Sequence, residues 1–352
     1  EMAAFIDALA AAIKHGDTGF GVPTDGVFAN SDAPLVKSAT FDGRSSTTIS
    51  ALSKGSYIVL IENGNKVYKP SVANFTPEWA TVDGKTGWYI QNPVTVGIKV
   101  SDVTLDKKVS NSENGTYGSA VNAAIGDTVW FDITAAVPEY PAKALDKTFI
   151  IKDTLPKGLT LQAIPKVYDK DGTEIPASAY TYTAEGKSFT FNFKYDSISD
   201  KKSVTVKYSA TLNKDAVLGS AGNVNKAELT YTNNPYIENG FTTIKKETPV
   251  YTYGLALTKT NNVDVNPEYL AGAVFVVERQ DDNDEKVWHK LTFVEESGNV
   301  YRYTRSTGDS ETATDQVKTG SDGKLNLNGL DDGAYRLREI EAPAGGYVLP
   351  KD

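Results

Sequence analysis

Residues 319–347 read TGSDGKLNLNGLDDGAYRLREIEAPAGGY, and this stretch gives the most specific indication of the fold. Turn sequences at 322–323 (Asp-Gly) and 331–333 (Asp-Asp-Gly) are typical of the connections between short strands. After the second turn, one face of a strand is formed by Tyr335, Leu337 and Glu339. A carboxylate among apolar side chains is costly to bury unless it is paired or protonated, so we expect a partner for Glu339.

The candidate partner lies at the start of the same expected domain, which begins near residue 249. Leu255, Leu257 and Lys259 alternate, which points the lysine toward the apolar face. Together these features resemble the CnaB-type domains of Gram-positive surface proteins and pilins. The residues that match the family pattern Y-x-L-x-E-x-x-A-P-x-G-Y, with one extra glycine, are Tyr335, Leu337, Glu339, Ala342, Pro343, Gly346 and Tyr347.

This resemblance implies a covalent cross-link inside the domain. In the family, a lysine on the first strand attacks an asparagine on the last strand, and the glutamate assists. The matching residues here are Lys259 and Glu339. The last strand is expected beyond Asp352, so we expect this domain to be truncated before its acceptor asparagine.

The composition excludes several classes of function. The chain has 352 residues, a net charge of −9, no cysteine and two histidines, His15 and His289. Without cysteine there are no disulfides, thiolate nucleophiles or cysteine-ligated zinc sites. An acidic chain is a poor nucleic-acid binder, and no apolar run reaches the ~18 residues of a membrane span. We therefore expect no metal, no cofactor, no nucleic-acid partner and no ordinary enzyme activity.

The rest of the chain is typical of short strands, and only residues 1–14 have the apolar spacing of a helix. The expected fold class is all-β, with three Ig-like sandwiches in series after this short helix. The expected domains are an N-terminal CnaB-like domain at 1–100, a middle CnaA-like domain at 101–248 and a C-terminal CnaB domain at 249–352. A truncated start of the first domain is an open alternative.

The middle domain repeats the inward-facing lysine with a different acid. Apolar and polar residues alternate along three segments of this domain. Lys107, Asp153 and Asn225 each lie on the apolar side of one of these segments. These segments resemble the CnaA-like middle domains of backbone pilins, which have an I-x-D-x-L-x-x-G-L strand and a closing N-x-A-x-L-x-Y strand. The resemblance implies an isopeptide bond between Lys107 and Asn225, with Asp153 as the catalytic acid.

Elementary acid–base chemistry supports this interpretation. Burial lowers the pKa of a lysine amine and raises that of a carboxyl, so a nucleophilic neutral amine can form beside a protonated acid. Each side chain reacts once, so the process is maturation and not turnover. By analogy with a disulfide, closing a loop of more than 100 residues contributes roughly 4–5 kcal/mol. The alternatives that stay open are Lys108 for the amine, Asp132 for the acid, and Asn223 or Asn233 for the amide.

The N-terminal domain carries a candidate polymerisation lysine. Residues 52–59 (LSKGSYIV) resemble a strand of N-terminal pilin domains, and 94–100 (VTVGIKV) is expected as a later strand. Backbone pilins carry a Y-P-K-N motif at this place, and a class C sortase joins its lysine to the C-terminal threonine of another subunit. The resemblance assigns this role to Lys99, although Gly97 and Ile98 replace the tyrosine and proline. Lys143 is the alternative, because Tyr-Pro-Ala-Lys at 140–143 looks more like the motif letter by letter but lies inside the middle domain.

These features predict a structural protein: the shaft subunit of a covalently polymerised pilus that supports adhesion. We expect it to be extracellular and anchored to a Gram-positive cell wall. The expected partners are neighbouring pilin subunits, the pilus-specific sortase and host extracellular matrix or mucus. The alternative is an ancillary or tip adhesin built on the same stalk domains. A secreted hydrolase would need a paired-carboxylate cleft, and the sequence singles out none.

Overall fold

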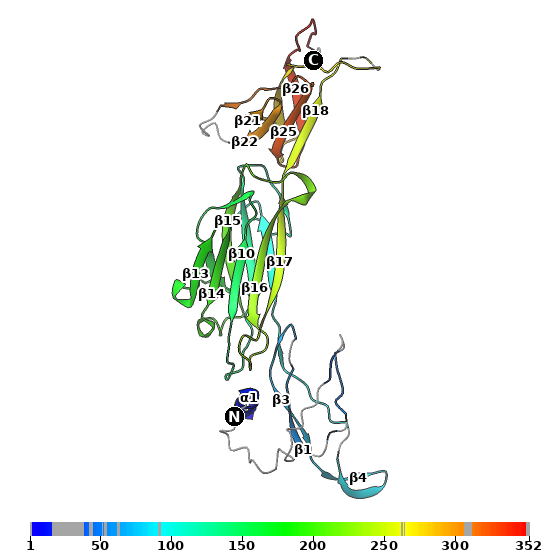
Figure 1. Cartoon of the computed structure of the whole chain (residues 1–352), viewed down its shortest axis with the longest axis vertical. Helices are drawn as coiled ribbons and strands as arrows, with labels where there is room; N and C mark the ends of the chain where they lie inside the picture. The colour runs from blue at the N-terminus through cyan, green and yellow to red at the C-terminus, as the bar shows by residue number, and fades with distance from the viewer. Residues whose placement is uncertain are drawn as a thin grey trace.

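The computed structural model describes residues 2–15, 39–41, 45–50, 52, 55–61, 64–90, 93–261, 263, 265–305 and 312–349. These residues are mostly in strands, and their one α-helix is α1 (Met2–His15), so the expected all-β class with a short N-terminal helix is confirmed. The strand-rich units follow one another along the long axis of the molecule (Figure 1). No helix within the described ranges is long and apolar enough to cross a bilayer.

Three short antiparallel pairs make up the described strands of the N-terminal region. They are β1 (Gly55–Val59) with β3 (Ser71–Phe75), β2 (Val67–Tyr68) with β6 (Val100–Ser101), and β4 (Glu78–Val82) with β5 (Lys85–Tyr89).

The strand expected over 94–100 is wrong in extent. Ladder pairing begins only at Val100, in β6, although the side chains of 93–99 still alternate between exposed and half-buried. A backbone bond from the Lys69 amide to the Lys99 carbonyl (2.9 Å) lies just before the ladder. The sequence carries the period of a strand here, but the period does not say whether a neighbouring strand is in reach.

The middle region is a sandwich of two sheets. One sheet has six strands in the order β13-β14-β10-β16-β17-β8: β8 (Val121–Asn122), β10 (Phe149–Thr154), β13 (Tyr180–Glu185), β14 (Ser188–Phe193), β16 (Asn223–Thr232) and β17 (Phe241–Tyr251). The other has the order β11-β15-β9-β7, with β12 also on β15: β7 (Leu105–Ser110), β9 (Thr128–Ala136), β11 (Leu159–Leu161), β12 (Lys166–Asp169) and β15 (Ser203–Leu212). Three short 3-10 turns lie in its connections: η1 (Ala177–Ala179), η2 (Tyr195–Ser197) and η3 (Gly219–Ala221).

Strict alternation explains why these segments form a sandwich. Buried and part-exposed residues alternate along all of β9, and β15 and β16 follow nearly the same pattern. Because side chains in a strand point to opposite faces in turn, each strand gives one apolar face to the space between the sheets. The largest buried side chains there are aromatic or branched, and they include Phe131, Phe149, Phe189, Phe191, Ile133 and Ile151.

The C-terminal region is a second, smaller sandwich. One sheet has the order β18-β25-β22-β21-β23: β18 (Tyr253–Thr258), β21 (Thr292–Ser297), β22 (Val300–Thr304), β23 (Ala313–Thr314) and β25 (Lys324–Leu330). In the other, β19 pairs with each of its neighbours: β19 (Val274–Gln280), β20 (Trp288–Lys290), β24 (Val317–Lys318) and β26 (Tyr335–Glu341). Its core includes Phe293, Leu325 and Leu327, so the alternating leucines of the sequence face inward as expected.

The two sandwiches are joined almost without a linker. β17 runs to Tyr251, past the expected boundary at 248, and only Thr252 separates it from β18. Thr252 is fully buried, and its hydroxyl donates to the Leu330 carbonyl (3.0 Å). The Ile125 amide donates to the Gly329 carbonyl (2.9 Å). One side-chain bond and one backbone bond therefore connect the two sandwiches at this joint.

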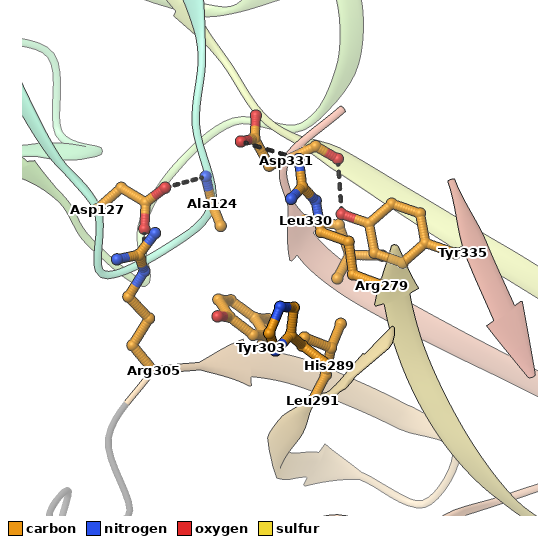
Figure 2. Close-up of a pocket in the computed structure, with 10 residues that line it drawn as sticks. All are labelled: Ala124, Asp127, Arg279, His289, Leu291, Tyr303, Arg305, Leu330, Asp331 and Tyr335. Carbon is orange, nitrogen blue, oxygen red and sulfur yellow. Dashed lines mark hydrogen bonds and ion pairs between the residues drawn. The ribbon is translucent and has the colours of Figure 1, made fainter. Parts of the chain in front are cut away.

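A cavity of about 160 Å³ lies beside this joint (Figure 2). Asp127 of the middle sandwich forms an ion pair with Arg305 of the C-terminal one, and it accepts a bond from the Ala124 amide (3.0 Å). Asp331 faces Arg279, at 3.8 Å from Nη2 to Oδ2. Each of these two carboxylates at the cavity therefore has an arginine as its partner.

Replacing Gly329 by alanine tests how tightly the joint is packed. Its backbone has φ +81°, and an added Cβ would lie 2.4 Å from Ile125 Cδ1. Gly172 has the same φ but nothing within 4 Å of an added Cβ, so Gly172→Ala reports the backbone strain alone, about 1–2 kcal/mol. We expect Gly329→Ala to lower the free energy of unfolding by clearly more than Gly172→Ala in urea titrations. Equal losses would show that the joint is loose at this point.

Asp331 predicts a pH dependence of the C-terminal sandwich. Burial, with a smaller contribution from Asp332, raises the pKa of the Asp331 carboxyl to about 6. A carboxyl whose pKa is raised by folding stabilises the folded state when it is protonated, and loses that contribution as the pH rises through the folded pKa. The stability of wild type relative to Asp331→Asn should therefore rise between pH 7 and pH 5 in thermal unfolding. A constant difference across this range would contradict the assignment.

Candidate functional site

Three side chains from two sheets meet inside the middle sandwich. Lys107 lies on β7, where it is opposite Ile133 of β9, and its side chain enters the space between the sheets. Asp153 on β10 and Asn225 on β16 come from the facing sheet, where Asp153 is opposite Ala227. Because Asn225 and Ala227 are two residues apart, both point into the core. The inward orientation expected for all three residues is what the structure shows, with exposures of 3%, 0% and 0%.

The contacts among these residues form a closed network. The Lys107 amine makes a very short ion pair with Asp153 Oδ2 and donates to the Tyr208 hydroxyl (3.0 Å). Tyr208 donates to Asp153 Oδ1 (3.1 Å), and Asn225 Nδ2 donates to Tyr208 (2.7 Å). The tyrosine hydroxyl thus contacts the amine, the acid and the amide at once.

Burial sets the protonation chemistry of the pair. Desolvation lowers the pKa of the Lys107 amine, and the nearby Asp153 carboxylate opposes this shift. Desolvation also raises the pKa of the Asp153 carboxyl, against the pull of Lys107. Both shifts favour moving a proton from the amine to the carboxyl, which gives a neutral amine and a neutral acid. A neutral amine has the free electron pair that a nucleophile needs.

Aromatic rings enclose the network. Phe131 stacks on Tyr208 with ring centroids 5.2 Å apart, and Phe189 meets the same ring edge-on at 5.1 Å. The Lys107 amine lies 5.1 Å from the centre of the Phe131 ring. These apolar faces keep water from the amine and the carboxyl, which is the physical cause of both pKa shifts.

One polar atom of the site is left without a partner. Asn225 Oδ1 is buried and has no hydrogen bond to any described residue. Leaving a buried carbonyl unbonded costs about 1–3 kcal/mol. The unbonded oxygen belongs to the carboxamide whose carbon a neutral Lys107 amine could attack.

The residues that the sequence left open as alternatives for the amine, the acid and the amide make other contacts. Lys108 is exposed near Asp106 (3.6 Å), and Asp132 pairs with Lys207 (3.2 Å). The Asn223 side chain bonds the backbone of Val217 and Val250, and Asn233 donates to the Gly64 carbonyl. The geometry therefore favours Lys107, Asp153 and Asn225 over these alternatives.

Sequence reasoning missed Tyr208. It lies on β15 between Val206 and Ala210 in the alternating pattern, so by position it is a core residue. The phenol hydroxyl could have identified it as part of the site, because a buried tyrosine hydroxyl needs a polar partner and the neighbouring core positions of the strand are apolar.

The C-terminal sandwich places a second lysine beside a second acid. The Lys259 amine, just after β18, lies 2.8 Å from Glu339 Oε2 on β26 of the opposite sheet. The two side chains are 29% and 7% exposed, so this pair is less buried than the one in the middle sandwich. The expected pairing of Lys259 with Glu339 is present.

The two candidate linkage lysines are both exposed. Lys99 lies in the extended segment before β6, close to the ion pair of Lys69 with Glu139 (2.8 Å). Lys143 lies in a loop whose amide donates to Asp7 of α1 (2.8 Å). Exposure alone does not choose between them.

Within the described ranges, no group of three or more histidine, aspartate or glutamate side chains could hold a metal ion. His289 forms a pair with Asp281 (2.9 Å) at an exposed turn.

Two protein-family models match the chain. Residues 125–235 match the Gram-positive pilin backbone subunit 2, Cna-B-like domain, and residues 254–352 match a prealbumin-like fold domain. The first contains the Asp153 and Asn225 positions, and the second contains Lys259 and Glu339.

Known proteins with similar sequence or structure are surface proteins and pilins. The trypsin-resistant surface T6 protein of Streptococcus pyogenes serotype M6 is 24% identical over 337 residues, which is 87% of this chain and 55% of that protein. The chain thus spans about half the length of this relative. The structure of the T6 backbone pilin of serotype M6 Streptococcus pyogenes, described as modular and three-domain, has a TM-score of 0.65 at 22% identity, covering 99% of this chain and 69% of that one.

A fragment of the major pilin GBS80 of Streptococcus agalactiae has a TM-score of 0.54 at 19% identity, covering 71% of this chain and 89% of that one. These likenesses extend across both sandwiches, and with the two family matches they confirm the resemblance that the motifs indicated. Residues 125–235 therefore match a pilin backbone Cna-B-like domain and residues 254–352 a prealbumin-like domain, in a chain whose fold is similar to that of solved backbone pilins.

Proposed function

We propose that this chain is the shaft-forming subunit of a covalently polymerised, cell-wall-anchored pilus, stabilised by an internal bond between Lys107 and Asn225. The observation that carries the proposal is the buried network of Lys107, Asp153 and Asn225 in the sandwich whose residues 125–235 match a pilin backbone domain. The protein performs no turnover. It makes its own cross-link once and is then a substrate of a pilus sortase.

The bond forms by attack of an amine on an amide. A proton passes from the Lys107 ammonium to Asp153, and the neutral amine attacks the Asn225 carboxamide carbon. The carboxyl returns a proton to the departing nitrogen, and the resulting carboxylate takes a proton from the Lys107 nitrogen. The C–N bond to Nδ2 breaks, ammonia leaves, and the acid is regenerated.

Such a bond would tie the two sheets of the middle sandwich together. Lys107 lies on β7 of one sheet and Asn225 on β16 of the other. By analogy with a disulfide across a loop of this length, the closure contributes roughly 4–5 kcal/mol. In a pilus under load, the segment between the two residues could not be pulled out. Lys259 and Glu339 would serve the same chemistry in the C-terminal domain.

Intact-mass spectrometry tests the cross-link. Wild-type protein should be lighter by one ammonia than its sequence mass, whereas Lys107→Ala, Asp153→Ala and Asn225→Ala should keep the full mass. Asn225→Ala should also lower the free energy of unfolding by roughly 4–5 kcal/mol or more.

The matched control is Asn223→Ala, because Asn223 is a buried asparagine on the same face of the same strand. This variant should still lose ammonia. Loss of ammonia in Asn225→Ala, or full mass in wild type, would refute the proposed bond.

Polymerisation through Lys99 completes the proposal. Its side chain is exposed at the boundary of the first two domains, in an extended segment before the β6 ladder. Lys143 lies instead in a loop of the middle domain, beside α1.

Incubation with the cognate pilus sortase tests the linkage lysine. Lys99→Ala should abolish the polymer ladder on denaturing gels, while Lys143→Ala and the exposed control Lys157→Ala should polymerise like wild type. Polymers that persist in Lys99→Ala and vanish in Lys143→Ala would reverse the assignment. A wild-type protein that never polymerises would point instead to an ancillary or tip pilin.

A further inference from the structure

The Tyr208 hydroxyl occupies the centre of the buried network. It accepts from the Lys107 amine (3.0 Å) and from Asn225 Nδ2 (2.7 Å), and it donates to Asp153 Oδ1 (3.1 Å). A hydroxyl has one donor and two acceptor positions, so these three bonds use its whole capacity.

The path between the acid and the leaving nitrogen runs through this hydroxyl. Asp153 Oδ2 pairs with the Lys107 amine, while its other oxygen, Oδ1, bonds Tyr208. The bond of Asn225 Nδ2 is to Tyr208 and not to Asp153. A proton that leaves Asp153 Oδ1 for Nδ2 therefore has Tyr208 as its bridge.

We propose that Tyr208 is a further catalytic residue of isopeptide formation, which relays the proton from Asp153 to the departing nitrogen of Asn225. This inference rests on the proposed bond between Lys107 and Asn225. The two oxygens of the acid then have different roles: Oδ1 receives and delivers a proton through the phenol, and Oδ2 takes the proton that the Lys107 nitrogen loses after attack.

The relay balances without any added reagent. The Lys107 electron pair forms the new C–N bond, and the carbonyl pair of Asn225 moves to Oδ1. The proton on Asp153 Oδ1 comes from the Lys107 ammonium, which donates to Tyr208 while Tyr208 donates to Oδ1. When the phenol then turns its O–H toward Nδ2, the Oδ1 proton passes to the Tyr208 oxygen as the phenol proton passes to Nδ2, so the tyrosine ends unchanged. Asp153 Oδ2 takes a proton from the Lys107 nitrogen, the Asn225 carbonyl re-forms as the old C–N bond breaks, and ammonia leaves.

The surroundings of Tyr208 favour a role as a proton relay over a role as a general base. Burial and the neighbouring Asp153 raise the pKa of the phenol well above its usual value, so the ring stays neutral and both protons must move together. Phe131 and Phe189 pack against the ring and fix the hydroxyl between its partners. A phenylalanine would fill the same space among these rings, so packing alone does not account for the hydroxyl.

The rate of ammonia loss in Tyr208→Phe tests the relay. Protein is made in a short cell-free pulse, reaction is stopped with denaturant at intervals, and the reacted fraction is read from intact mass. General acid catalysis contributes about 10²–10⁴ in rate, so Tyr208→Phe should react at least ~100-fold more slowly than wild type. The control is Tyr182→Phe, which alters a half-buried tyrosine packed on Phe191 of the same domain and should react at the wild-type rate.

A second variant separates proton transfer from positioning. Site-specific 3-fluorotyrosine at 208 keeps the size and the hydrogen bonds of the phenol but makes it more acidic, so a relay must change the rate. Tyr208→Phe that reacts as fast as wild type overturns the relay, and so does 3-fluorotyrosine with an unchanged rate. If wild type never loses ammonia, the proposed bond itself is refuted. If wild type loses ammonia and Tyr208→Phe does so at the same rate, only the relay is refuted.

Discussion

The buried ion pair between Lys107 and Asp153 is the constraint on which the middle domain depends. Both side chains are wholly removed from water, and the cost of desolvating two charges usually exceeds what their attraction returns. Replacing a buried ion pair by well-packed apolar residues of similar volume is often neutral or stabilising. The pair is therefore better explained by chemistry than by stability, since only an amine and an acid held dry beside an amide can exchange protons and react.

The architecture around this pair follows from the need to bring three strands together. Lys107 comes from the start of the domain and Asn225 from near its end, and the two sheets must close face to face before they meet. The proposed cross-link could thus form only after the domain has folded. A directly continuous connection through Thr252 joins this domain to the next without a linker segment.

The period of two along strands was enough to predict which side chains of the site face inward. Lys107, Asp153 and Asn225 were found because charged or amide groups stand out against apolar neighbours. Tyr208 was missed because an aromatic residue in an alternating strand has the same pattern as ordinary core. The joint near Thr252 could not be predicted from the sequence either, because contacts such as that of Ile125 with Gly329 join loops about two hundred residues apart. The strand expected over 94–100 failed for a related reason, because pairing depends on a distant partner.

Tandem mass spectrometry of a proteolytic digest tests the central claim most directly. The account predicts one branched peptide in which the segment containing Lys107 is joined to the segment containing Asn225, with a mass one ammonia below the sum of the two. Two separate linear peptides of unmodified mass, with Lys107 and Asn225 intact, would contradict it.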